Sequence, residues 1–388
     1  MFILSLQSSY TAARTRENNL QIFPRGINRF SSEFFKSLAK NKNGTFISSP
    51  VSAAIATAMA AYGANGKTRH ELVRALHLPI TRNFILKRFQ NFIFNLNNVR
   101  DIEFHLATKL FIQNQFEINE LYNEVTNLIF QSQIENINFN NTDEAAEEIN
   151  NWCKEYTKTK ITDIINADDL KDARLVMINA VYFKGNWMYP FRNVLQERTF
   201  YLSETNSITI PMMCTTALYN YNWIYNRMAL YIELPYVSDP KNSFSMYIII
   251  SEKIDGLAAI IDKLDELDFR NFNQSEKSAH LCMPKFKIES ELDLIPTLND
   301  MGIYDMFGDT ADFSNLTPEN NLKVTKIIQK AFINVDEKGS EASAATASVF
   351  VSRSMSIDIT IDKPFISAIV SKTTGTPLFY ARINDPRS

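Results

Sequence analysis

Apolar positions in the first half of the chain recur at helical spacing. Four of them fall three or four residues apart and share one helix face: Ile27, Phe30, Phe34 and Leu38. Segment 51–59 is apolar on nearly every side, which predicts a central, buried helix. Segment 145–156 is amphipathic and follows acidic residues, which favours another helix. Thr68 and Glu71 have the spacing of a capping box that would open a short helix through Leu76.

The second half changes to strand patterns. Segments 175–183 and 244–250 are rich in β-branched and apolar residues, as buried strands are. Isoleucines alternate with polar residues over 357–361, which indicates a half-exposed strand. Two apolar runs flank a turn-like tetrapeptide within 364–383, which predicts a hairpin. Helices first, sheets later and no βαβ rhythm together predict the α+β class.

Composition excludes several classes of function. The 388 residues carry a net charge of −3, so the whole chain is not a nucleic-acid binder, and no apolar run approaches a membrane span. The four histidines form no zinc-binding pair, and no hydrolase elbow or phosphate loop occurs, so we expect no enzyme and no metal site. Cys153, Cys214 and Cys282 are far apart and odd in number, so we expect free, mostly buried thiols and no disulfide.

The N-terminal segment 1–24 is expected to be a flexible tail, and 25–388 a single domain. Phe2 to Leu6 are apolar but shorter than a signal-peptide core of about 7–15 residues, so a signal remnant and a plain tail both remain open. Four sequons permit glycosylation if the chain is secreted: Asn43, Asn140, Asn273 and Asn315. We expect an extracellular, secreted protein.

Segment 339–348 does not fit a packed domain. It holds almost no bulky side chain, and structureless loops of this length are usually functional or disordered. If it became a strand, one face would carry only small residues: Ser340, Ala342, Ala344, Thr346 and Ser348. Such a ribbon could enter an existing sheet without displacing core volume. A solvated linker is the alternative reading.

From about Ile27 to Pro386 the chain resembles the serpin family. Segment 336–342 is similar to the family's hinge, and segment 46–52 to the start of its buried helix. Segment 179–187 resembles the third strand of its main sheet and the breach tryptophan. Further short motifs occur in the family's order: Pro190-Phe191, 211–213, 233–236, 283–286 and 362–365.

The resemblance implies a serpin fold of about nine helices and about three sheets. It also implies an exposed reactive loop at about 338–358, and a scissile bond fourteen residues after Gly339, at Arg353-Ser354. The implied hinge residues are Glu337, Gly339, Ser340, Glu341, Ala342, Ala344 and Thr346. Arg353 suits the pocket of trypsin-like proteases, which would be trapped as an acyl-enzyme when the cleaved loop enters the main sheet. The function implied is that of a suicide inhibitor and not of an enzyme, and the partner a trypsin-like serine protease.

Two groups of residues match the family's control regions. Trp187 resembles the breach tryptophan, and Lys285 with Glu337 resembles the breach ion pair, although an ordinary surface salt bridge is the alternative. Ser49, Ser52 and Asn179 match shutter positions, whose hydrogen bonds gate sheet opening. Gln329 stands where many family members have histidine, and an amide can both donate and accept hydrogen bonds.

A polyanion site is a further hypothesis. Arg82, Lys87, Arg88 and Arg100 surround the segment that binds heparin in some relatives, and Lys36, Lys40 and Lys42 form another cluster. A solvated helix face is the competing interpretation. No other cofactor is expected. The chain resembles monomeric arthropod haemolymph serpins that restrain extracellular protease cascades in immunity and melanization, and a non-inhibitory carrier or chaperone is the alternative.

Overall fold

The computed structural model describes residues 2–79, 81–99, 101–157, 159, 161–191, 195–239, 242–272, 275–340 and 356–387, with side chains from residue 21 onward other than that of Ser340. These ranges contain eight α-helices, which are α1 (Phe2–Asn41), α2 (Pro50–Gly63), α3 (Gly66–Ala75), α4 (Arg82–Asn97), α5 (Glu120–Leu128), α6 (Thr142–Tyr156), α7 (Leu257–Ile261) and α8 (Ile295–Asp300). None of these helices is both long and apolar enough to cross a bilayer.

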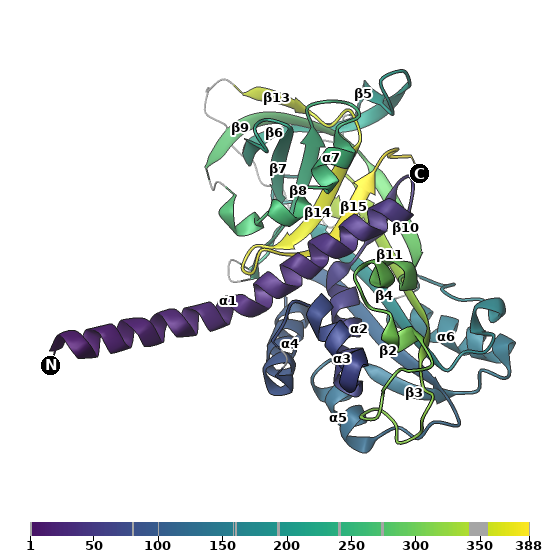
Figure 1. Ribbon diagram of the computed structural model, residues 1–388. Coiled ribbons are helices and arrows are strands. Elements are labelled where there is room, and N and C mark those ends of the chain that lie inside the picture. Colours follow the sequence, from purple (N-terminus) through teal and green to yellow (C-terminus); the bar gives the residue numbers. More distant parts are fainter. Residues whose placement is uncertain are drawn as a thin grey trace.

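The strands form two hydrogen-bonded sheets (Figure 1). One sheet has six strands, which are β10 (Phe286–Asp293), β11 (Val324–Val335), β4 (Leu175–Asn186), β2 (Ile102–Gln113), β3 (Gln133–Ile137) and the short β12 (Gly339–Ser340). The other has nine, which are β1 (Phe46–Ser48), β15 (Thr376–Ile383), β14 (Phe365–Ser371), β8 (Phe244–Ser251), β7 (Ala229–Pro235), β6 (Ser207–Ile224), β9 (Glu276–Pro284), β13 (Ile357–Thr360) and β5 (Leu195–Tyr201). The predicted α+β class is confirmed. The resemblance implies about three sheets, whereas the described strands form two, because β6 is hydrogen-bonded to β5, β7 and β9.

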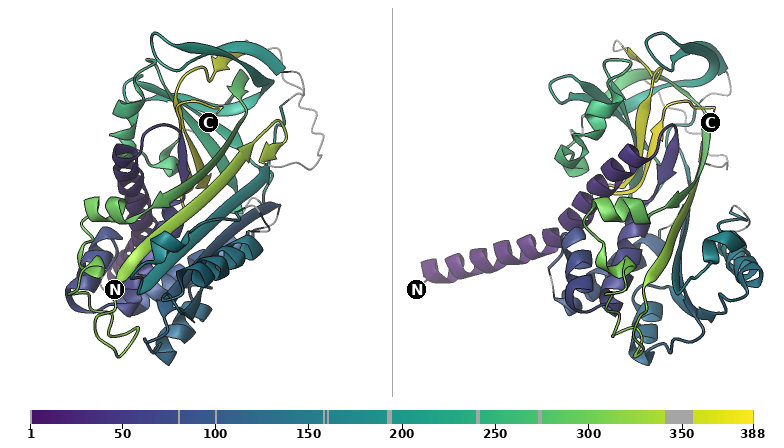
Figure 2. Two further views of the ribbon diagram at one scale, coloured as in Figure 1. Left: turned by 90° about the vertical axis from the view of Figure 1, so that its right-hand side faces the viewer. Right: turned by 45° about the vertical axis from the view of Figure 1, so that its right-hand side comes forward.

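The six-stranded sheet separates two apolar cores. Alternate residues of β4 point to opposite faces, as strand geometry requires. Met177 and Val181 pack into the main core with α2, whereas Val176 and Ile178 pack into a smaller core under α6. Figure 2 shows α6 lying across this second face, on the opposite side of the sheet from α2, α3 and α4. Both faces of the central strands are therefore covered.

A parallel seam runs through the middle of this sheet. β4 pairs with β2 antiparallel on one side and with β11 parallel on the other, from Leu175–Val324 to Tyr182–Phe332. The upper end of β4 continues beyond the last β11 partner. There its residues Gly185 and Asn186 pair with β12 instead.

The predicted helices and strands at 51–59, 145–156, 175–183, 244–250 and 357–361 are confirmed, and the predicted hairpin is β14–β15. The capping box is wrong. Helix α3 begins at Gly66, and Thr68 lies within its first turn, where its hydroxyl donates to Asp305 Oδ2 at 2.6 Å. Glu71 accepts from the backbone N–H of Asp305 at 2.8 Å. Tertiary partners therefore take the polar groups that a cap would use.

The expectation of three free cysteines is also wrong. Cys214 on β6 stands directly opposite Cys282 on β9, their Cα atoms are 4.2 Å apart, and the two sulfur atoms are bonded. The cysteines are 68 residues apart, so only the strand register brings them together. Cys153 on α6 is a buried free thiol, as expected.

The expected boundary between tail and domain, at residue 25, falls inside α1. Phe23 is already buried in the main core, where its ring contacts Phe89 and Phe92 of α4. An ideal Cβ placed on Gly26 would come within 2.7 Å of His77 O, so helix α1 passes very close to the end of α3 here. Packing against the domain therefore starts slightly before the expected boundary.

Candidate functional site

The hinge begins as a short strand beside β4. After β11 the chain turns at Asp336, whose carboxylate accepts from the N–H of Lys338 at 2.9 Å and of Gly339 at 3.2 Å. It then runs antiparallel to β4, with Gly339 opposite Asn186 and Ser340 opposite Gly185. The first two residues of the small-sided ribbon therefore already occupy the upper end of the seam.

Glycine is required at position 339. Its φ of +145° is rarely adopted by residues with a side chain, and an ideal Cβ would lie 2.1 Å from the backbone oxygen of Gly185. A side chain here would force β12 away from β4. The absence of a side chain at Gly339 thus allows the hinge to approach the backbone of Gly185 and Asn186.

Trp187 holds the turn before the hinge. Its indole Nε1 donates to Asp336 O at 3.0 Å, and its backbone N–H donates to Lys338 O at 3.0 Å. The ring stacks on Tyr236 with centroids 4.5 Å apart. The predicted breach tryptophan therefore contacts the hinge directly.

Lys285 and Glu337, predicted as a breach ion pair or an ordinary surface salt bridge, are in contact. Lys285 Nζ lies 3.0 Å from Glu337 Oε1, and both side chains are partly exposed. An exposed pair of this kind contributes about 0–1 kcal/mol to stability. The backbone of Glu337 is held separately, because its oxygen accepts from Phe191 N–H at 2.8 Å. The ion pair therefore adds to a turn that backbone bonds already fix.

Gln329 connects the seam to the start of α2. Its Oε1 accepts from Ser49 N–H at 2.8 Å, and its Nε2 donates to Ser49 O at 2.9 Å. Ser49 Oγ donates to Leu378 O at 2.7 Å on β15. Both side chains are fully buried. Many family members have histidine at this position. Here the glutamine amide makes two hydrogen bonds to the backbone of Ser49.

Asn179, the predicted shutter residue on β4, lies across the seam from Gln329. It is the register partner of Gln329 across the seam, and its Oδ1 accepts from Ser52 Oγ at 3.1 Å and Thr108 Oγ1 at 2.8 Å. Its Nδ2 has no hydrogen-bond partner among the described residues. Thr108 was not predicted; its position opposite Asn179 on β2 would have identified it only once the register was known.

Two lysines of β11, neither of them predicted as a site residue, bind the segment that links α6 to β4. Lys330 Nζ donates to Asp163 O and lies 3.0 Å from Glu289 Oε1. Lys326 Nζ lies 3.0 Å from Asp169 Oδ1. Lysines among the buried apolar residues of this strand were the available signal. These contacts hold the segment between α6 and β4 against β11, on the far side of the seam from β4.

The distal flank of the loop is anchored on the other sheet. β13 pairs parallel with β9, with Asp358 opposite His280 and Thr360 opposite Cys282. Ser356 and Ser278 hydroxyls lie 2.7 Å apart, and Arg198 Nη1 donates to Thr360 Oγ1 at 3.2 Å. The two flanks of the loop therefore belong to different sheets.

Several predicted site residues lie outside the described residues or side chains. These are the two residues of the predicted scissile bond, four predicted hinge residues and one residue of the basic cluster: Arg353, Ser354, Glu341, Ala342, Ala344, Thr346 and Arg100. For Ser340 only the backbone is described.

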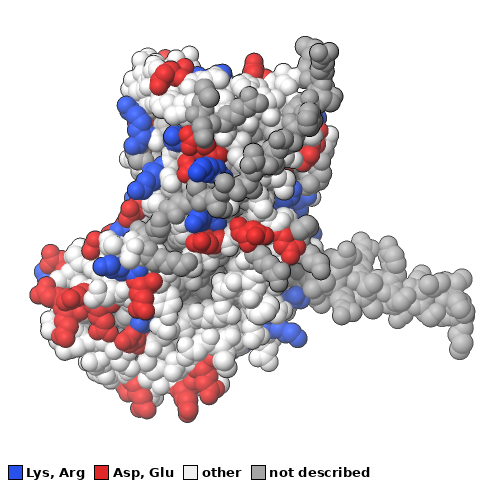
Figure 3. Space-filling view, turned by 180° about the vertical axis from the view of Figure 1, so that it is seen from behind, with Lys and Arg blue, Asp and Glu red and all other residues white. Residues whose placement is uncertain are grey.

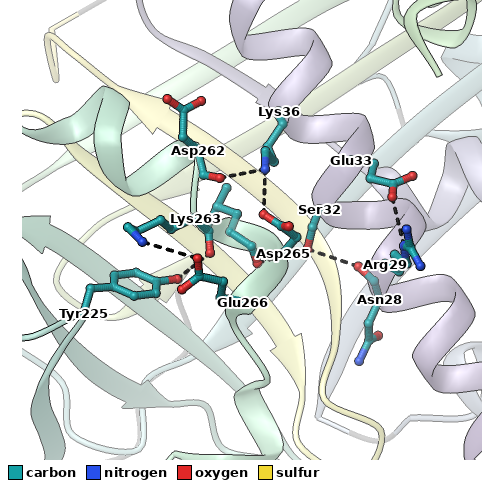
Figure 4. Close-up of polar contacts among 11 residues, drawn as sticks. Asn28, Arg29, Ser32, Glu33, Lys36, Tyr225, Asp262, Lys263, Asp265 and Glu266 are labelled. Carbon is teal, nitrogen blue, oxygen red and sulfur yellow. Dashed lines mark hydrogen bonds and ion pairs between the residues drawn. The ribbon is translucent and has the colours of Figure 1, made fainter.

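The basic residues proposed for a polyanion are not equally available. Arg82 donates to Ala64 O at 3.0 Å and Asn65 Oδ1 at 2.7 Å, so it holds the turn between α2 and α3. Arg88 lies over the Phe84 ring, and Lys87 is exposed. In the second cluster, Lys36 donates to Asp262 O and Asp265 Oδ1, both at 2.6 Å (Figure 4).

On the face seen in Figure 3, acidic side chains gather at the lower left, where α6 lies, and basic side chains are spread rather than gathered. Helix α6 starts with Asp143 and Glu144. This face does not suit a polyanion.

Comparison with known proteins gives a consistent result. Residues 25–386 match the family model "Serpin (serine protease inhibitor)". The chain is 31% identical over 386 residues to antitrypsin of Bombyx mori, covering 98% of this chain and 95% of that protein. It is also 31% identical over 361 residues to antichymotrypsin-2 of Bombyx mori, covering 92% of each. The crystal structure of Serpin48 from Tenebrio molitor superposes with a TM-score of 0.84 at 30% identity, covering 94% of this chain and 98% of that one.

Proposed function

Because the chain belongs to the serpin family of serine protease inhibitors, we propose that it is a suicide inhibitor of trypsin-like serine proteases, cleaved at Arg353-Ser354. The long cationic side chain of Arg353 fits the carboxylate at the base of a trypsin-like pocket. The relatives at 31% identity include proteins named antitrypsin and antichymotrypsin, so the specificity rests on Arg353 and not on overall similarity.

The proposed mechanism is a kinetic race. The protease serine attacks the Arg353 carbonyl, forms an ester and releases the amine of Ser354. The freed segment, starting at Ser340, enters the seam between β4 and β11, and the attached protease is carried along until its oxyanion hole is distorted. Trapping succeeds when insertion is faster than hydrolysis of the ester.

One observation carries the proposal: β12 is already paired with β4 at the upper end of the seam. The ribbon that follows has small residues at alternate positions, so it can extend β12 downward between β4 and β11. Each step would exchange the β4–β11 bonds for two new sets of ladder bonds. Breach and shutter residues line the same path at its top and middle.

Incubation with trypsin, followed by denaturing electrophoresis, tests the proposal. We expect a detergent-resistant band at the summed mass of the protease and the cleaved inhibitor. Arg353→Ala should abolish this band and leave the melting temperature of the native protein unchanged. Cleavage at Arg353 without any covalent band would support a non-inhibitory carrier or chaperone instead.

We further propose that the protein is a secreted monomer acting in an extracellular protease cascade of the innate immune or melanization type. The resemblance to insect serpins and the exposed sequon asparagines Asn43 and Asn140 support this setting. A glycosaminoglycan activator would use the exposed Lys87 and Lys40, because Arg82 and Lys36 are engaged within the protein. If heparin leaves the association rate with trypsin unchanged at low salt, that activator is excluded.

A further inference from the structure

The pairing of β6 with β9 gathers three metal-binding side chains at one place. Cys214 stands opposite Cys282, and Thr216 stands opposite His280. Residues two apart on a strand share a face, so all four side chains lie on the same side of this strand pair. One ligand atom from each of Cys214, His280 and Cys282 lies within 4.8 Å of the other two.

The imidazole is oriented toward the sulfur atoms. His280 Nε2 lies 3.6 Å from Cys282 Sγ, while His280 Nδ1 lies 2.9 Å from Thr216 Oγ1. With its Nδ1–H donated to the threonine hydroxyl, the ring presents the Nε2 lone pair to the cysteines. This is the arrangement in which histidine ligands are held in metal sites.

We propose that Cys214, Cys282 and His280 form a redox-gated site for a soft divalent metal ion such as zinc. A tetrahedral zinc ion has Zn–S of about 2.3 Å and Zn–N of about 2.1 Å, which places a sulfur and a nitrogen about 3.6 Å apart. The separation between Cys282 Sγ and His280 Nε2 already has this value. Two thiolates and one imidazole leave a fourth position for water.

The disulfide between Cys214 and Cys282 closes the site. A dithiol reductant opens it by giving two electrons and two protons to the disulfide and becoming a disulfide itself. The two thiols then lose two protons as the metal binds, because the thiolate is the ligand. Both sulfur atoms are buried, and His280, which is partly exposed, forms the side by which the ion would enter.

The site adjoins the distal anchor of the loop. His280 and Cys282 are the register partners of Asp358 and Thr360 on β13. Metal binding does not require the protease-inhibiting function, so the two proposals can fail separately.

Cobalt(II) is the probe, because a thiolate-ligated cobalt ion has a near-ultraviolet charge-transfer band and intense visible bands when tetrahedral. The full chain carries Cys153→Ala, so that Cys214 and Cys282 are its remaining thiols. It is titrated before and after reduction with a phosphine, which is then removed by gel filtration without oxygen. Near-ultraviolet circular dichroism monitors the fold throughout.

We expect no charge-transfer band from the oxidised protein and one cobalt equivalent bound by the reduced protein. His280→Ala should raise the cobalt dissociation constant at least tenfold, and Thr216→Val about tenfold, since it frees the imidazole ring. His70→Ala, which changes an exposed histidine on α3, is the matched control and should have no effect.

Three results would overturn the inference. The first is a reduced, folded protein without the band. The second is an unchanged dissociation constant in His280→Ala. The third is a disulfide that is reduced only when the circular dichroism signal of the fold is lost, because the site would then never open in the native protein.

Discussion

Gln329 illustrates how one amide can control the seam. It lies on β11 opposite Asn179 of β4, yet its two polar atoms bind the backbone of Ser49 behind the sheet. The amide therefore fixes the start of α2 to a strand that the proposed mechanism must separate from β4. A histidine ring could not offer the same donor and acceptor pair to one residue.

Replacing Gln329 by leucine should destabilise the native protein by about 1–3 kcal/mol, because the buried Ser49 N–H loses its acceptor. Ser49 O still accepts a hydrogen bond from Ala53 N–H, so losing the bond from Gln329 Nε2 costs less stability than losing the acceptor of Ser49 N–H. Urea unfolding measures the change. The control is Gln133→Leu on β3, where the glutamine is exposed and the expected effect is within about 0.5 kcal/mol. Equal effects of the two changes would contradict the role of Gln329.

At this scale the family resemblance identified the residues but not their bonds. Ser49, Ser52, Asn179 and Gln329 were predicted as one group, and they are brought together. The acceptor on Leu378 and the donor on Thr108 depend on strand register, which a single sequence does not contain. The disulfide escaped prediction for the same reason.

Helix α6 and the link that follows it cover the seam. Cys153 lies on the inner face of α6 in the smaller core, and burial raises the pKa of its thiol to about 12, above an ordinary value near 9. A raised pKa means that the folded state holds the proton more tightly than the unfolded state. The resulting stabilisation is complete below pH 9 and is lost as the pH rises toward 12.

The stability of the wild-type protein should therefore fall more steeply above pH 9 than that of Cys153→Ala, by up to about 1.4 kcal/mol per pH unit. Urea unfolding at pH 8, 9 and 10, in buffers at about equal ionic strength, measures the slope. For each protein the free energy of unfolding is expressed relative to its value at pH 8. This subtracts the pH-independent loss of stability caused by the smaller alanine side chain. If the free energies of unfolding of the two proteins fell equally with pH, burial in the smaller core would not raise the pKa of the Cys153 thiol.

Ala342→Arg should turn the inhibitor into a substrate. The residue is two positions after Ser340 on the face of small residues, so an arginine would have to enter the closed part of the sheet as insertion begins. A barrier raised by about 1.4 kcal/mol slows insertion tenfold, and hydrolysis then wins. The number of inhibitor molecules consumed per trypsin molecule gives the measurement.

Glu341→Arg is the matched control, because its side chain alternates to the other face of the extended ribbon. An unchanged consumption ratio in Ala342→Arg would contradict the insertion path.

Element type was readable from periodicity, and element ends were not. The apolar run in α2 and the β-rich run in β4 gave the correct assignments because burial on all sides leaves a long apolar signature. The start of α3 was misplaced, since Thr68 and Glu71 bind Asp305 and its neighbours, which are remote in sequence. Local capping rules cannot anticipate such partners.

For the whole molecule, the arrangement predicts that the cleaved form is the more stable one. In the native sheet β4 and β11 pair directly as parallel strands. An additional strand inserted between them would pair antiparallel with both and form two hydrogen-bonded ladders in place of one. Calorimetry before and after cutting within 341–355 should show a higher melting temperature for the cut protein. A melting temperature equal to or below that of the intact protein would refute the stored-energy mechanism.

The family resemblance covered the fold from about Ile27 to Pro386, whereas the lysines over the seam and the proposed metal-binding group came only from the structure. The lysine contacts with Asp163 and Asp169 join residues more than 150 positions apart, and Cys214 is 68 residues from Cys282.

The placement of β12 and β13 on separate sheets has a consequence for how the protein is used. A break between them leaves each new end attached to its own sheet, with nothing to bring the ends back together. Every molecule would then work once, so control over the target protease would come from how much inhibitor is synthesised and how fast spent copies are cleared.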